Sequence, residues 1–129
     1  MLEKNVDNQF ANPKIITQRI TLIVMAVVLA ILASILVMQR LRASDPYIQE
    51  VFSQVGNPAK GQAIFEINCA GCHGFTADGN VGPSLHNVSK RRSPLNLIEQ
   101  VTSGDTPPMP KFQPSPQEMA DLLSYLKQL

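Results

Sequence analysis

The sequence has few cysteines that could join distant loops covalently and little positive charge that could bind a polyanion. Its two cysteines, Cys69 and Cys72, lie too close together for a disulfide framework between distant loops. It has no tryptophan, and no block of like charge is longer than three residues. The formal net charge is +1, whereas a nucleic-acid-binding domain carries a strongly basic face, so no nucleic-acid partner is expected. The 129 residues suffice for one ordinary domain and an attachment.

One long hydrophobic run lies between two arginines. The nineteen residues 20–38 contain no charge, and Arg19 and Arg40 flank them. At about 1.5 Å per residue, the segment between the arginines spans about 30 Å, the thickness of a bilayer's hydrocarbon core. A cleavable signal peptide is the alternative, but its apolar region is only about 7–15 residues long and a small-x-small site follows it. The sequence therefore predicts a polar tail over 1–19 and an uncleaved transmembrane anchor with a basic collar over 20–42.

The basic residues around this run favour one orientation. Three precede it and two follow it closely: Lys4, Lys14 and Arg19 before, Arg40 and Arg42 after. Because the cytoplasmic side of a span carries the excess of Lys and Arg, the N-terminus is expected in the cytoplasm. The rest of the chain would then lie on the opposite side of the membrane.

The remaining residues, 43–129, have the pattern of a small all-α domain. Six Lys and Arg against eight Asp and Glu make its net charge −2. Four helix starts are marked by a capping residue followed by proline, at Asp45-Pro46, Asn57-Pro58, Ser93-Pro94 and Ser115-Pro116. No stretch alternates as a half-buried strand would. We therefore predict a linker helix over 43–56 and a folded domain over 57–129. Its long loops bury little by themselves, which indicates a bound group at the centre.

The motif Cys69-Ala70-Gly71-Cys72-His73 indicates what that group is. C-x-x-C-H is the attachment pattern of c-type haem: two thiols bond to one edge of the porphyrin, and the next histidine is carried beneath the iron. Three alternatives compete with it. A redox dithiol needs a strand–helix context, a zinc site needs four ligands, for which His86 would have to join the cluster, and a motif of five residues also occurs by chance.

Two later segments support a haem site. In Gly82-Pro83, a rigid turn, the carbonyl of Pro83 could accept the Nδ1–H of His73 and fix its tautomer, although an ordinary surface turn is the alternative. Met109 lies in a loop stiffened by prolines, which suits a thioether presented to iron as the distal ligand. Met119, its rival, falls on the apolar face of the last predicted helix and is expected in the core.

These motifs together resemble the small class I cytochromes c. C-x-x-C-H, then Gly82-Pro83-Ser84-Leu85, then Met109-Pro110-Lys111-Phe112 before a C-terminal helix is the plan of that family, and the resemblance covers about residues 57–129. The membrane-anchored cytochromes of cyanobacteria are the most similar members. The resemblance implies that the first domain helix, with Gly61 and Phe65, crosses the last helix near Tyr125. Asn87 departs from the glycine that many relatives carry there.

The sequence thus predicts a single-electron carrier, not an enzyme, with one covalent haem c. Cys69 and Cys72 would bind the porphyrin, His73 and Met109 the iron, and Pro83 would orient His73. Expected partners are membrane lipid and transiently docking redox proteins, without a small-molecule substrate. Haem is joined to c-type proteins on the outer face of energy-transducing membranes, so the domain is expected in the thylakoid lumen or periplasm. A haem sensor or weak peroxidase with a dissociable methionine, and an anchored subunit of a terminal oxidase, are the alternatives.

Overall fold

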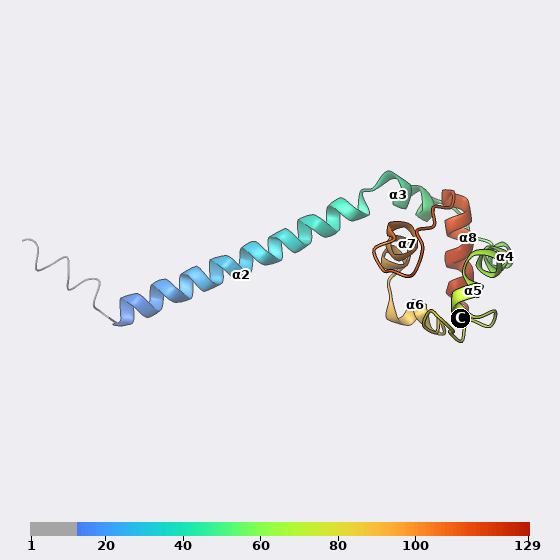
Figure 1. The fold of residues 1–129 in the computed structure, drawn as a ribbon. Coiled ribbons are helices and arrows are strands. Elements are labelled where there is room, and N and C mark those ends of the chain that lie inside the picture. Colours follow the sequence, from blue (N-terminus) through green and yellow to red (C-terminus); the bar gives the residue numbers. More distant parts are fainter. Residues whose placement is uncertain (1–12) are drawn as a thin grey trace, which may run out of the picture. The chain divides into compact units, whose positions relative to one another are not determined.

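The computed structural model describes residues 13–129, and the chain divides into two units between residues 42 and 43. All regular structure in the described part is helical, as predicted (Figure 1). The first unit contributes α2, which runs from Pro13 to Ala43. The second contains α3 (Pro46–Ser53), α4 (Pro58–Asn68), α5 (Ala70–His73), α6 (Val88–Arg91), α7 (Pro94–Ser103) and α8 (Pro116–Leu126). Most of the predicted tail, with Lys4, lies outside the described residues.

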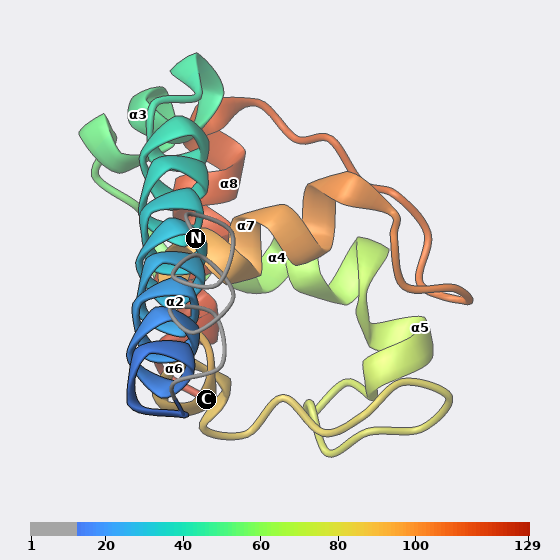
Figure 2. The ribbon, with the colours of Figure 1, turned by 90° about the vertical axis from the view of Figure 1, so that its left-hand side faces the viewer.

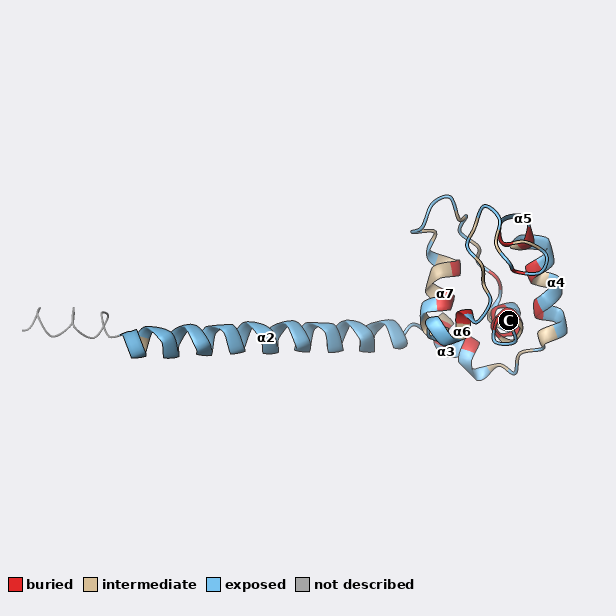
Figure 3. Cartoon of the chain, turned by 90° about the horizontal axis from the view of Figure 1, so that it is seen from below, coloured by how far each residue is buried: buried red, intermediate tan, exposed pale blue. Residues whose placement is uncertain are grey.

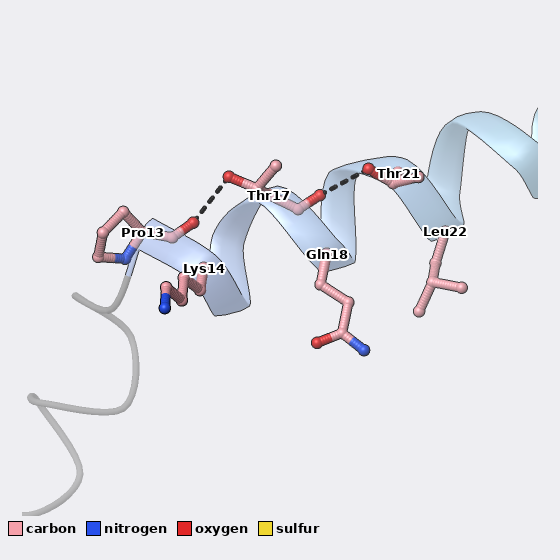
Figure 4. A pocket seen from close by; sticks show the side chains of 6 residues that line it. All are labelled: Pro13, Lys14, Thr17, Gln18, Thr21 and Leu22. Atoms are coloured by element: carbon pink, nitrogen blue, oxygen red, sulfur yellow. Dashed lines mark hydrogen bonds between the residues drawn. The ribbon is translucent and has the colours of Figure 1, made fainter.

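Helix α2 is long and apolar enough to cross a membrane by length and composition. None of its residues is buried, and it is almost entirely exposed in Figure 3. It begins at Pro13, within the segment expected to be a tail. The hydroxyls of Thr17 and Thr21 donate to the carbonyls of Pro13 and Thr17, at 2.7 and 2.9 Å (Figure 4). These polar groups are therefore satisfied within the helix, as an apolar surrounding requires.

The hollow drawn in Figure 4 lies at the start of α2. Its lining residues all belong to the first ten positions of this one helix: Pro13, Lys14, Thr17, Gln18, Thr21 and Leu22. Side chains along a single helix do not converge on a point, so the functional site must be sought in the second unit.

The four predicted helix starts of the second unit are confirmed. The side chains of Asp45, Asn57, Ser93 and Ser115 each accept a backbone N–H of the helix that follows, and proline takes the first helical position. At Ser115 the side chain of Glu118 completes a capping box. The short helices α5 and α6 were not predicted, because one turn of helix carries no periodic pattern.

Helix α8 forms the centre of the second unit. Its fully buried Met119 and Leu122 lie in one core with Phe65 of α4 and Ile98 of α7. Met119 is thus a core residue, as predicted. In Figure 2, α4 and α7 leave α8 toward the same side, and α5 and the loop after α7 lie at their far ends. The C-x-x-C-H motif and the loop with Met109 therefore flank the same side of the domain.

Candidate functional site

The C-x-x-C-H motif forms a single helical turn directly after α4. The backbone N–H of Cys69 donates to Phe65 of α4 at 2.8 Å, and the N–H of His73 donates to Cys69 at 2.9 Å. The motif is thus attached to a helix whose Phe65 is fully buried in the core. Cys69 is half-buried, Cys72 is exposed, and both are free thiols. Both sulfurs are available for covalent attachment.

The environment of Cys69 differs from that of a redox dithiol. Burial, and to a smaller extent the neighbouring Cys72, raises the pKa of the Cys69 thiol to about 11. Reactive thiols in C-x-x-C redox motifs have a lowered pKa instead, because a helix N-terminus or a cation stabilises the thiolate. The unreacted thiol of Cys69 therefore stays protonated at neutral pH, which disfavours the redox alternative.

His73 is buried and its ring is held in one orientation. Its Nδ1 lies 2.8 Å from the carbonyl oxygen of Pro83, a distance at which an Nδ1–H donates a hydrogen bond. A side chain at Gly82 would press on the same ring, since a Cβ there would lie 2.7 Å from Cε1 of His73. With Nδ1 occupied in this way, the lone pair of Nε2 is free to bind a metal ion.

The loop that follows His73 is held together by hydrogen bonds of its own polar groups. His86 Nε2 lies 2.7 Å from Asp78 Oδ1, and the hydroxyl of Thr76 donates to the same carboxylate at 2.5 Å. These hydrogen bonds, that of Thr76 first, lower the pKa of Asp78. Arg91 donates to the carbonyls of Ser84 and His86, at 3.1 and 3.0 Å. His86 is therefore engaged by Asp78, which disfavours its role as a zinc ligand.

Met109 lies in the loop between α7 and α8. Its backbone N–H donates to Thr106 at 2.9 Å, and its half-buried side chain packs against the core. Gln100 of α7 donates to the hydroxyl of Thr106 at 2.8 Å and contacts the sulfur of Met109 at 3.8 Å. Gln100 was not predicted as part of the site. Gln100 follows the polar Glu99 on the same helix, so no local pattern distinguished it.

These residues fit a c-type haem. The structure offers two free thiols on one helical turn, an imidazole whose Nε2 is left for a metal, and a thioether in a loop at the same side of the domain. Imidazole nitrogen and thioether sulfur are the iron ligands of cytochromes c. The fold and the site together define a small c-type cytochrome.

Comparisons with known proteins give the family. The family described as "Cytochrome C oxidase, cbb3-type, subunit III" matches residues 56–126, more than half of the chain. A "Cytochrome c-553-like" protein of Synechocystis sp. is 60% identical over 85 residues, which are 66% of this chain and 81% of the relative. The chain belongs to this family of c-type cytochromes, and it binds haem c covalently. The predicted likeness to class I cytochromes c is confirmed.

A solved structure shows the same fold. Cytochrome cL from Hyphomicrobium denitrificans superposes with a TM-score of 0.50 at 22% sequence identity. The match covers 65% of this chain and 58% of that cytochrome. At this identity the likeness supports the helical fold and not a shared partner.

Proposed function

We propose that this protein is a single-electron carrier, not an enzyme, whose haem iron is bound by His73 and Met109. The observation that carries the proposal is the fixed ring of His73, buried and 2.8 Å from the Pro83 carbonyl. A ring held in this way presents one nitrogen in one direction, which is what a metal ligand requires. When bound, the haem supplies the one-electron redox centre.

The protein residues keep this centre closed to other chemistry. Cys69 and Cys72 would hold the porphyrin, and His73 and Met109 would both bind the iron, which would leave a small-molecule substrate no place on the metal. A thioether ligand favours the reduced metal more than a second imidazole would. Pro83 keeps the Nδ1 proton of His73 in place, and the loop from Thr106 to Phe112 presents the sulfur of Met109. Electrons then pass to and from docked redox proteins without a bond being made or broken.

The anchor determines where this carrier acts. We propose that α2 crosses the membrane once, with the N-terminus in the cytoplasm and the haem domain in the thylakoid lumen or periplasm. The two basic residues after the run, Arg40 and Arg42, lie in the last turn of α2 and support a membrane boundary there. Membrane lipid and membrane-associated donor and acceptor proteins are the partners that follow.

Replacement of Met109 tests the proposed ligation. The oxidised protein should show the weak near-red absorption band of methionine–iron bonding, and the reduced protein should resist carbon monoxide. Met109→Ala should abolish the band and admit carbon monoxide. Met119→Leu is the matched control, because Met119 is fully buried in the core and a near volume-conserving change costs less than about 1.5 kcal/mol. A band that survives Met109→Ala would show that another residue is the ligand, and rapid carbon monoxide binding by the unchanged protein would favour a sensor.

The family's description favours a second candidate, an anchored haem subunit of a terminal oxidase. In that role the protein would carry the same electrons but only within a stable complex. Native electrophoresis of gently solubilised membranes, followed by haem staining, separates the two. A free carrier should migrate at its own size, and an oxidase subunit should migrate with the larger complex.

A further inference from the structure

The segment between the anchor and the family's matched region is an integral part of the haem domain. The family match begins at residue 56, and the sequence suggested only a linker helix before it. In the structure, α3 packs on α8 (Figures 1 and 2). Its Ile48 and Val51 are buried. A helix that buries two large apolar side chains is not a flexible tether.

Polar contacts join this segment to α8 along its length. The side chain of Gln117 donates to the carbonyl of Val55 at 3.1 Å. Immediately after the segment, the backbone N–H of Asn57 donates to the buried carboxylate of Asp121 at 2.7 Å. At the other end of the segment, the hydroxyl of Tyr47 donates to the carbonyl of Pro114 at 3.0 Å.

The bond from Tyr47 differs from the others because it ends on the loop that carries Met109. Pro114 is buried and lies immediately before Ser115, the capping residue of α8. Between Met109 and this cap, Pro110 and Pro114 have no N–H to donate. Within the described residues, that stretch is held by a hydrogen bond from Phe112 N–H to Val101 at 3.0 Å and by the bond from Tyr47.

The hydroxyl of Tyr47 is suited to act as a permanent donor. Burial, and then the nearby negative charge of Glu118, raises the pKa of this phenol. Tyr47 therefore keeps its proton at physiological pH. A half-buried carbonyl that lost this donor would have to find water or move, and the loop has few other bonds to resist the movement.

We propose that Tyr47 is a positioning residue for Met109: through Pro114 it braces the loop that keeps the thioether on the iron. This inference rests on the proposed ligation by Met109. It gives α3 a role in the redox site, in addition to its place after the anchor. A loosened loop should let an external ligand replace the thioether more easily.

Titration with imidazole tests the brace in the full-length holoprotein in detergent. Tyr47→Phe keeps the ring and removes only the donor. Loss of the near-red band of the oxidised protein reports displacement of Met109, and imidazole should bind about two- to tenfold more tightly to Tyr47→Phe, the range that one ordinary hydrogen bond represents. Hydrogen exchange at the Phe112 amide should also become faster.

Gln117→Ala is the matched control, since it cuts a contact of the same segment with α8 but leaves the Pro114 carbonyl alone. It should lower stability in denaturant while leaving imidazole affinity unchanged. Unchanged imidazole affinity in Tyr47→Phe would overturn the proposed brace. An equal increase of imidazole affinity in Gln117→Ala would also overturn it, because it would show a general loosening of the domain. Failure of the proposed ligation is seen separately, as a near-red band that persists in Met109→Ala.

Discussion

Gly61 of α4 lies directly against the backbone carbonyl of Asp121 in α8, so the two helices meet without a side chain between them. A Cβ on Gly61 would lie 2.9 Å from the Cβ of Tyr125 and closer still to the Asp121 carbonyl. One turn along α4, the ring of Phe65 packs on that of Tyr125, with centroids 5.3 Å apart. This crossing fixes the end of α4, from which the attachment motif continues.

Gly61→Ala should destabilise the holoprotein by about 1–3 kcal/mol, the usual cost of forcing atoms into a packed contact. Helix propensity alone predicts the opposite sign, because alanine is favoured over glycine by about 1 kcal/mol. Ala63→Gly, at an exposed position of the same helix, should lose only about that propensity difference. Denaturant unfolding followed by helical circular dichroism measures both. A Gly61→Ala protein as stable as the parent would mean that the helices can move apart freely.

Gln100→Leu should lower the reduction potential. The amide N–H near the sulfur of Met109 withdraws electron density from it, which favours the reduced metal, and the leucine removes that donor. The loss of one hydrogen bond of ordinary strength corresponds to a fall of about 20–60 mV for one electron. Asn96→Ala removes an exposed amide from the same helix and should leave the potential unchanged. A redox titration measures the potentials. Equal potentials for the parent and Gln100→Leu would show that the amide affects only Thr106, and not the sulfur of Met109.

The sequence predicted the helix starts of the second unit because each is encoded locally. A capping side chain and the proline after it act within one turn, so Asn57 and Ser115 could be interpreted without tertiary information. The attachment motif is local in the same way. The tie between His73 and Pro83 was also within reach, because the rigid turn follows the motif closely.

Contacts between distant segments could not be predicted from the same patterns. Tyr47 and Pro114 are 67 positions apart, and nothing near either residue indicates the other. Likewise, the guanidinium of Arg91 donates to two carbonyls of the neighbouring loop, and no local pattern around Arg91 indicates these partners. Polar side chains have many partners available, and the fold selects among them.

Asp78→Asn should destabilise the loop that follows His73, and the size of this effect should depend on pH. Hydrogen bonds from Thr76 and His86 lower the pKa of Asp78 in the folded protein, so folding favours the ionised carboxylate. The stabilisation is complete above the unfolded pKa of about 4 and disappears as the pH falls through the lower, folded value. The parent should therefore be more stable than Asp78→Asn at pH 7, and the difference should shrink at about pH 3.

Denaturant midpoints of the holoprotein at the two pH values measure this effect. Asp105→Asn serves as the control, since its exposed side chain lies in the other loop. If the difference in denaturant midpoint between the parent and Asp78→Asn were the same at both pH values, the ionised carboxylate would contribute nothing to stability.

Helix α2 should hold the full chain in the membrane after an alkaline carbonate wash, because 31 residues of continuous helix include a charge-free run long enough for the hydrocarbon core. A chain shortened to begin at Ala43 retains α3 and the whole second unit, so it should be soluble and keep the haem spectrum of the parent. In sealed vesicles whose outer face is the lumenal or periplasmic one, protease should digest the haem domain. A mature N-terminus beyond Met38 would show that the run is a signal peptide, and digestion only from the cytoplasmic face would reverse the orientation.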